Sequence, residues 1–339
     1  MVIATTPVAR WAWGRDDDSS DDVTRCLRDA LAALSVLARH RFVPSAVDLR
    51  VSVREAGKSN NYLYRGDIAV PTDAGGHGQA LARVVDRVRA AMSAGEVGAV
   101  DASATCKGPV ATGHGEEQGE DLFLLGASAF AGFVSVDLTT FTDVWLPFDL
   151  KGRPQPEVHA ANGPRLAAAL RELAEVLGSE TDPDDPTYFA RPTEDGAENF
   201  LDAEGRASDV WRSFEVPRRY DVFLHAPGFG HIGYARTAKA EVRYVPVRSE
   251  HGLLGYVWAS DEENAASFEP VTVDDDVVYR VGLVWLERLE AAHARGLSPV
   301  EALEELSRLQ DERGAGRVET SEPPRTSRLD VLRKVTSGD

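Results

Sequence analysis

VDLRVSVREAGKSNNYLYRGDIAV, residues 47–70, is the stretch that decides the fold. Its first part alternates apolar and polar residues, which is the pattern of a strand with one buried face. Residues 58–61 are polar and predict a turn, and residues 62–70 predict the antiparallel partner strand. Consecutive strands joined by a short turn indicate an antiparallel sheet. The alternating apolar residues are Val47, Leu49, Val51 and Val53.

Three helices are predicted around this pair of strands. The first spans about Asp22 to His40, where an Asp-rich run is placed to cap the exposed amides. The second spans about Gly78 to Met92, and the third begins near Pro164 with Asn162 as a nearby cap and ends at Gly178. The apolar stripe of the first helix comprises Val23, Cys26, Leu27, Ala30, Leu31, Leu34 and Leu37.

Further strands complete a first α+β domain. The order is strand, helix, two strands, helix, several strands, helix, which favours a mainly antiparallel sheet with helices packed on one face. A doubly wound parallel sheet would need helices between most strands, and they are missing. The additional strands are expected at 2–13, 98–106, 121–126, 132–139 and 143–148, with a polar loop at 113–121.

The pattern of the second half predicts a further α+β domain, again a mainly antiparallel sheet with helices packed on one face, and with the C-terminal helices after the sheet. A helical stripe containing Trp285 ends at Gly296, and Ser298 with Glu301 forms a capping box that opens another helix to about Leu309. A short final helix is expected from Leu329 to Val335. The four short strands are predicted at 220–225, 232–236, 241–247 and 254–258.

The domain boundaries follow from composition. Residues 179–200 contain three prolines and no sustained period, so they are interpreted as an acidic linker. An ordered loop anchored by Tyr188, Phe189 and Phe200 is the alternative. The boundaries are therefore 1–178 for the N-terminal domain, 179–200 for the linker, 201–310 for the C-terminal domain and 311–339 for a polar tail, whose Gly- and Pro-rich part 311–327 is expected to be mobile.

Charge and composition exclude several classes of protein. The 339 residues contain 37 Lys+Arg and 55 Asp+Glu, a net charge of −18, which disfavours nucleic-acid binding. No apolar run approaches the ~20 residues of a membrane helix, and no secretion signal is visible, so we expect a cytoplasmic protein without a membrane partner. Two cysteines, Cys26 and Cys106, exclude a disulfide framework and a cysteine-based zinc site. No cofactor or metal is predicted.

The acidity is concentrated in two segments. Residues 175–209 carry eleven Asp or Glu and two Arg, and residues 259–279 carry seven Asp or Glu and no Lys or Arg. Such segments can steer a basic partner and speed association. They can equally serve only to keep the protein soluble.

A glycine-rich motif and two histidines suggest an enzyme as an alternative. Residues 228–233 match GxGxxG but lead into a predicted strand, not a helix, so a hairpin turn is expected instead of a dinucleotide site. His225 and His231 flank this turn, with Asp221, Glu241 and Glu250 nearby. Two His with carboxylates can bind zinc or run acid–base chemistry, although surface or structural His is the ordinary case.

The partner-binding hypothesis centres on one tryptophan and the acidic residues after it. Trp258 is followed by Ala259-Ser260-Asp261-Glu262-Glu263, which is interpreted as a strand end beside an acidic helix start. Exposed aromatics next to carboxylates suit protein recognition, whereas the alternative is a core tryptophan. The predicted partner-binding residues are Trp258, Asp261, Glu262, Glu263, Asp274, Asp275 and Asp276.

The last third of the chain resembles a module of uncharacterised actinobacterial proteins, some of which look like immunity proteins of toxin systems. The resemblance lies in residues 255–261 (GYVWASD), 264–268 (NAASF), 282–286 (GLVWL) and 295–299 (RGLSP). It involves no catalytic motif, so no functional residue is carried over. The resemblance implies a bacterial intracellular protein of binding type.

These observations leave three hypotheses of function. The first is a non-enzymatic acidic binding protein, such as an immunity protein that neutralises a toxin by covering a basic or active-site surface. The second is an enzyme that uses His225, His231 and nearby carboxylates. The third is a structural subunit of a larger complex, with the tail 311–339 folding onto a partner.

Overall fold

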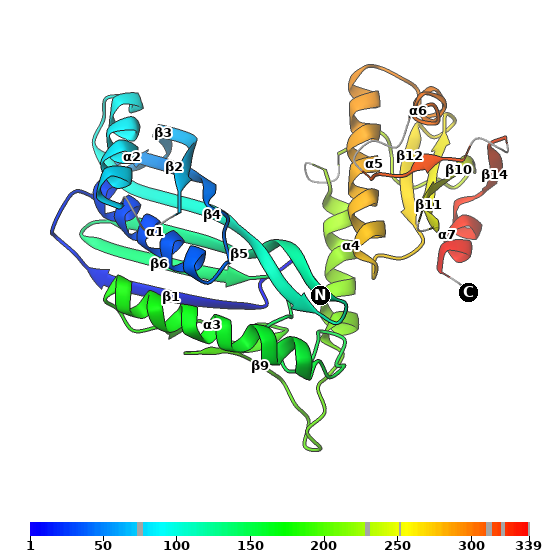
Figure 1. The fold of residues 1–339 in the computed structure, drawn as a ribbon. Helices are drawn as coiled ribbons and strands as arrows, with labels where there is room; N and C mark the ends of the chain where they lie inside the picture. The colour runs from blue at the N-terminus through cyan, green and yellow to red at the C-terminus, as the bar shows by residue number, and fades with distance from the viewer. Residues whose placement is uncertain (73–76, 228–230, 251, 310–313, 320–322, 338–339) are drawn as a thin grey trace. The chain divides into compact units, whose positions relative to one another are not determined.

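The computed structural model describes the chain except residues 73–76, 228–230, 251, 310–313, 320–322 and 338–339. The chain forms two compact units, unit 1 (Met1–Trp211) and unit 2 (Arg212–Asp339). Each unit combines an antiparallel sheet with helices, which confirms the α+β class (Figure 1).

Unit 1 is built on a seven-stranded antiparallel sheet. Its strand order is β3-β2-β4-β5-β6-β1-β7, so the hairpins β2–β3, β4–β5 and β5–β6 are neighbours in both sequence and space. The strands are β1 (Ala9–Asp16), β2 (Ala46–Glu55), β3 (Lys58–Pro71), β4 (Val97–Thr112), β5 (Gly115–Phe130), β6 (Phe133–Thr140) and β7 (Asp182–Pro183).

Three helices lie on one face of this sheet (Figure 1). Helix α1 (Asp22–Arg39) packs on β4, β5 and β6, and α2 (His77–Ala91) and α3 (Pro156–Leu177) both contact it. Helix α1 begins where the sequence predicts, because the Asp21 side chain accepts a hydrogen bond from the Thr24 amide. Its stripe is buried against alternate residues of the strands, including Val100, Ala102, Ala104 and Cys106 of β4.

Several local predictions in unit 1 are wrong. The turn between the first two strands falls at Ala56–Gly57, where Gly57 has a left-handed φ of 72°, so residues 58–61 belong to β3. The predicted loop at 113–121 is mostly strand, because β4 and β5 continue as a long hairpin. Residues 143–148 form turns, not a strand, and β1 begins at Ala9 instead of Val2.

Helix α3 also begins earlier than predicted. Pro156 occupies its first turn, and Pro164 lies inside the helix. Asn162 is therefore not a cap. Its buried side chain accepts from the Ala111 amide and donates to the Ala111 carbonyl, at 3.1 and 2.8 Å, and so fixes α3 to β4. Gly178 ends the helix with a left-handed φ of 63°, as predicted.

Residues 179–200 are an ordered part of unit 1. Strand β7 pairs with β1, and β8 (Ala190–Thr193) and β9 (Gly196–Asn199) form a small hairpin. The indole of Trp11 donates to the Thr193 carbonyl at 2.8 Å, and Phe189 is buried. The ordered-loop alternative therefore describes this segment, and the compact units divide at Trp211.

Unit 2 contains a smaller antiparallel sheet. A π-helical turn, η2 (Trp211–Glu215), leads into α4, and the strand order is β12-β11-β10-β13 with β14 also paired to β10. Its elements are α4 (Val216–His225), β10 (Glu241–Ser249), β11 (Gly252–Ser260), β12 (Ala265–Pro270), α5 (Asp276–Ala294), α6 (Pro299–Leu306), β13 (Arg317–Val318), β14 (Arg325–Arg328) and α7 (Leu329–Ser337).

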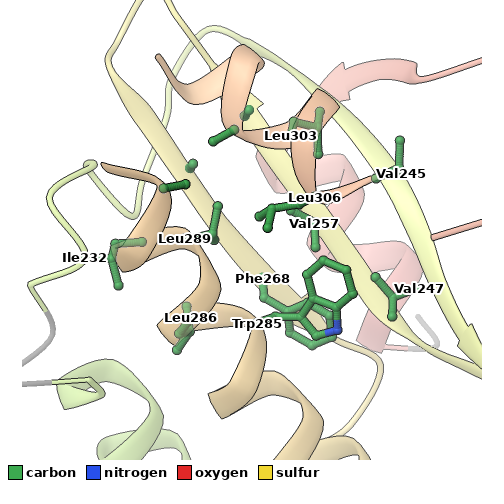
Figure 2. Packing of buried hydrophobic residues seen from close by; sticks show 14 of the residues in the cluster. Ile232, Val245, Val247, Val257, Phe268, Trp285, Leu286, Leu289, Leu303 and Leu306 are labelled. Carbon is green, nitrogen blue, oxygen red and sulfur yellow. The ribbon is translucent and has the colours of Figure 1, made fainter. Parts of the chain in front are cut away.

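Helices cover both faces of the unit 2 sheet, so the prediction of helices on one face holds for unit 1 but is wrong for unit 2, where α7 adds a second layer. On one face α5 and α6 pack against the sheet. In that core the rings of Phe268 and Trp285 are stacked, with their centroids 6.5 Å apart (Figure 2). On the other face Trp258 packs with Leu329 and Leu332 of α7. Strands β11 and β12 are consequently buried from both sides.

The two strands predicted at the start of unit 2 are wrong. Residues 220–225 are helical, not a strand, because the residues that α4 buries are Arg219 and Phe223, one helical turn apart. Tyr220 and Leu224, on the other side of this helix, are exposed. Residues 232–236 form only a bridge between Ala235 and Ala265, and β12 was not predicted.

At the end of the chain, the helices begin where the sequence predicts. The capping box of Ser298 and Glu301 opens α6, and α7 begins at Leu329, as predicted. The described parts of the predicted mobile stretch include β13 and β14, which pair with β10. Residues 310–313 and 320–322 lie outside the described residues.

Candidate binding face

The face of the unit 1 sheet opposite the helices is the candidate site, and we call it the open face. Within the described part of unit 1, α1, α2 and α3 all lie on the other face. The open face carries the alternate residues of five strands, which the strand register brings into rows. These residues are Arg10, Ala12, Gly14, Arg50, Ser52, Arg54, Asp101, Ser103, Thr105, Leu124, Gly126, Ser128, Phe130, Phe133, Ser135, Asp137 and Thr139.

Small side chains occupy the centre of the open face. One row pairs Ser103 with Gly126, and the next pairs Ser128 with Ser135, whose hydroxyls lie 2.9 Å apart. The Asp137 carboxylate lies over Gly126, where an added Cβ would come within 2.4 Å of its oxygen. The centre is therefore a shallow polar surface that another molecule could approach closely.

Two phenylalanines stand at one end of the open face. Phe130 and Phe133 are 63% and 48% exposed, and they pair across the turn between β5 and β6. This turn needs left-handed backbone at Ala131 and Gly132, with φ of 50° and 84°. The Phe133 ring extends over Gly14, where a Cβ would lie 2.6 Å from it. An exposed apolar pair of this size is a common mark of a contact surface.

A groove of about 520 Å³ lies at the other end, where two hairpins separate. Strands β2 and β4 pair up to Arg50 and Ser103, and beyond this point β2 pairs only with β3 and β4 only with β5. The connection at 41–45 lies against β4 there. An added Cβ on Gly108 would come within 2.1 Å of the Arg41 carbonyl oxygen. The close approach of this connection keeps the two hairpins apart.

The groove has an excess of carboxylates. Arg50 pairs with Asp67 at 3.1 Å, and Lys107 lies 3.6 Å from Glu120. Asp48 and Asp121 also line the groove, and neither carboxylate has an ion pair or hydrogen bond among the described residues. The groove therefore has two negative charges that no neighbouring cation neutralises.

An apolar pocket of about 290 Å³ adjoins the groove. Thr105, Asp121 and Leu124 line both hollows. The other residues of the pocket are Ile3, Ala4, Phe123 and Phe141. Charged and apolar surfaces therefore meet at Asp121.

The carboxylate at the centre of the open face is partly desolvated. Burial raises the pKa of the Asp137 carboxyl above its ordinary value of 3.8, and Arg10 at 3.5 Å lowers it by less. Asp184 adds a repulsive contribution. A flat sheet surface of small residues thus excludes some water even without a cover.

Trp258 does not lie where the partner-binding hypothesis needs it. Its side chain is fully buried between β11 and α7, and its indole donates to the Glu269 carboxylate at 3.3 Å. The expectation of an exposed anchor at Trp258 is wrong, because α7 covers the second face of the sheet. Core packing, the alternative given to this residue, describes it.

The acidic residues after Trp258 have structural partners. Residues 261–264 are a turn between β11 and β12, not a helix start. Asp261 accepts from the Val300 amide in the first turn of α6, and Glu263 accepts from the Lys239 and Ala240 amides. Glu262 is exposed, with no side-chain partner among the described residues.

The second group of predicted acidic residues, Asp274 to Asp276, lies at the start of α5. Asp275 is its N-cap and accepts from the amides of Val277 and Val278. Asp276 pairs with the guanidinium of Arg219. Asp274 is exposed at the preceding bend. Asp275 and Asp276 are thus engaged within unit 2.

Arg219 forms a buried ionic network that the sequence analysis did not find. It donates to Glu215 and to the Val273 carbonyl, at 3.0 and 2.9 Å, and stacks over Tyr279. Arg219 and Glu215 are almost fully buried, so this network fixes α4 against α5. Burial raises the pKa of the Tyr279 hydroxyl more than Arg219 lowers it.

The histidines and cysteines that the structure describes do not gather into a site. His225 is the last residue of α4, exposed, with Nδ1 2.7 Å from the Asp221 carbonyl, and His231 is exposed in a following coil. The predicted hairpin between them is wrong because His225 ends a helix, and Gly228–Gly230 lie outside the described residues. Among described residues, no three His, Cys, Asp or Glu gather as a metal site. Burial raises the pKa of the Cys106 thiol to about 12.

Comparisons with protein-family models, curated proteins and solved structures give no match. No helix in the described part of the chain has the length and apolar character needed to cross a membrane.

The sequence analysis missed Phe130 and Phe133, although a signal was present. From Phe123 on, the buried residues of β5 are Phe123, Leu125, Ala127 and Ala129, so Phe130 falls out of phase with them. Phe133 is likewise out of phase with Val134, Val136 and Leu138 of β6. A large apolar residue at an outward position of an alternating strand indicates an exposed contact residue.

Proposed function

We propose that this chain binds another protein through the open face of unit 1. The observation that carries the proposal is a seven-stranded sheet whose second face is covered by no helix in the described part of unit 1 and presents Phe130 and Phe133. Aromatic side chains that protrude beside flat polar surface supply the desolvated anchors of many interfaces. The groove at the other end gives the same face a concave surface with an excess of carboxylates.

The electrostatics favour a basic partner. The chain carries an excess of 18 negative charges, and such a field accelerates the approach of a cationic protein at low salt. Together with the resemblance of its last third to immunity proteins, this supports a toxin as the partner. In this proposal the chain is a non-enzymatic binding protein that neutralises the toxin by covering its basic surface.

The test is capture of the partner from the cells that make this chain. The tagged full chain is used at low and high salt, and retained proteins are identified by mass spectrometry. We expect one basic protein in stoichiometric amount, reduced at least tenfold by Phe130→Ser with Phe133→Ser. A control with Tyr188→Ser and Leu201→Ser removes similarly exposed apolar side chains outside the open face and should retain the partner.

The result that would overturn the proposal is retention of the partner by the Phe130 and Phe133 variant at the wild-type level. Equal loss in the control variant would also count against it, since the effect would not belong to the open face. The toxin form of the proposal has its own readout. Co-expression with the captured protein should rescue growth, and the open-face variant should rescue it less.

A further inference from the structure

We propose that the groove between the β2–β3 and β4–β5 hairpins binds an Arg or Lys side chain of the partner, and that the adjoining pocket takes a neighbouring apolar side chain. This inference rests on the proposed function and names the chemistry of the segment that the open face recognises. The occupant is an extended stretch of the partner chain in which a basic residue stands next to a large apolar one.

The charge of the groove selects a cation. Its two basic side chains are already engaged, Arg50 with Asp67 and Lys107 with Glu120. The carboxylates of Asp48 and Asp121 have no partner among the described residues. An anionic guest would face this excess of carboxylates, whereas a guanidinium or ammonium group would supply the missing countercharge.

The neighbouring pocket selects an amphipathic occupant over a free cation. Leu124 is 40% exposed and lines both hollows, together with Asp121 and Thr105. The remaining pocket residues are apolar: Ile3, Ala4, Phe123 and Phe141. An apolar side chain seated in this pocket of about 290 Å³ would remove the surface of Leu124 from water. A metal ion or a small polar cation would leave that surface uncovered.

The backbone explains why the site is preformed. The groove exists because the connection at 41–45 lies against Gly108 and the two hairpins separate beyond Arg50 and Ser103. Both carboxylates are on strands, Asp48 on β2 and Asp121 on β5. Groups held on paired strands lose little further freedom on binding, which favours affinity for a short segment.

The experiment is a selection of random heptapeptides displayed on phage against the immobilised full chain. We expect enriched peptides to carry Arg or Lys beside a large apolar residue. A synthetic copy of the most enriched peptide is then titrated by fluorescence anisotropy. Its affinity should fall at least tenfold with Asp48→Asn and Asp121→Asn, and should weaken as salt rises.

The matched control is the pair Glu175→Gln and Glu304→Gln, which changes the net charge equally at exposed positions outside the groove. It should change the affinity less than twofold, and all variants should melt at the temperature of the wild type. Absence of enrichment, enrichment of acidic peptides, or equal binding by the groove variant would each overturn the inference.

Peptide binding by the variant with Phe130→Ser and Phe133→Ser separates this inference from the proposed function. If the peptides depend on Phe130 and Phe133 but not on Asp48 and Asp121, the groove is not the basic site and the inference fails. Binding through the open face would then stand, because its own test is capture of the whole partner by the Phe130 and Phe133 variant.

Discussion

The two sheets of this chain differ in how many of their faces are covered. In unit 1 strand β4 alternates buried and accessible residues, because helices lie on one face only. In unit 2 strand β11 is buried at nearly every position from Leu254 on, because α5 and α6 lie on one face and α7 on the other. Antiparallel sheets tolerate both arrangements, and the strand sequence shows which is used.

The same difference in cover determines whether an aromatic residue of the sheet is buried or exposed. Trp258 lies in a nearly continuous apolar strand and is covered by α7. Phe130 and Phe133 lie at outward positions of alternating strands and stay exposed. An aromatic residue is therefore a candidate anchor only where its strand alternates and it breaks the phase. The acidic neighbours of Trp258 carry no such information, since most of them cap or tether nearby elements.

The largest expected effect comes from Trp258→Ala. Removing this fully buried side chain should leave a cavity between β11 and α7 and destabilise unit 2 by about 3–5 kcal/mol. Hydrogen exchange of the full chain should then quicken in β10, β11 and β12 and stay unchanged in unit 1. The exposed pair Phe130→Ser and Phe133→Ser is the contrast, with an effect within about 1 kcal/mol. Equal losses of stability from Trp258→Ala and from the Phe130 and Phe133 substitutions would contradict the difference between the covered and the open sheet faces.

A smaller effect is expected from loosening the cover itself. Leu332 is buried on α7, and its neighbour Val331 is exposed. Leu332→Ala should cost about 2–3 kcal/mol, whereas Val331→Ala should cost less than about 0.5 kcal/mol. Denaturant unfolding followed by tryptophan fluorescence measures both, because Trp258 lies beneath α7. A null effect of Leu332→Ala would mean that α7 does not stabilise that face.

Local signals predicted much of the fold. The Asp21 cap, the Ser298–Glu301 capping box and Gly178 mark helix ends through contacts within a few residues, so the sequence alone indicates them. The failures involve distant partners. Arg219 suits a buried helix face only because Glu215 and Asp276 pair with it. Asn162 lies inside a helix because its amide bonds to Ala111 of β4.

The candidate site was less predictable for the same reason. The groove depends on Gly108 meeting the backbone of Arg41, residues 67 positions apart that no local pattern connects. Phe130 and Phe133 were detectable by phase, but only once the bounds of β5 and β6 are known. The predicted residues around Trp258 failed because a helix 71 positions further on, beginning at Leu329, covers that indole.

Gly108→Ala tests whether this backbone contact shapes the open face. Its Cβ would come within 2.1 Å of the Arg41 carbonyl oxygen, so β4 or the 41–45 connection must move. We expect a loss of about 1–3 kcal/mol in unit 1 and weaker binding of the groove peptide. Gly113→Ala, with nothing within 4 Å, is the control and should be close to neutral. Unchanged stability of Gly108→Ala would show that the connection yields easily.

The smallest effect concerns the one partly desolvated carboxylate at the centre of the open face. Burial raises the folded-state pKa of Asp137 above 3.8, so the folded state binds its proton more tightly than the unfolded state. Ionised Asp137 therefore costs stability above its folded pKa, and the cost disappears below the unfolded value. Asp137→Asn should stabilise unit 1 by less than about 1 kcal/mol at pH 7, with the gain shrinking as the pH falls toward 4.

Denaturant unfolding of both proteins at pH 7 and pH 4 measures this difference, with Asp67→Asn as a control for a more exposed carboxylate of unit 1. A loss at pH 7 would mean that the Arg10 pair outweighs desolvation. The expected gain bears on the proposed function. If the open face binds a partner as proposed, contacts of Asp137 there would offset its small cost in stability, whereas the carboxylates of unit 2 that cap or pair with its helices contribute to the fold itself.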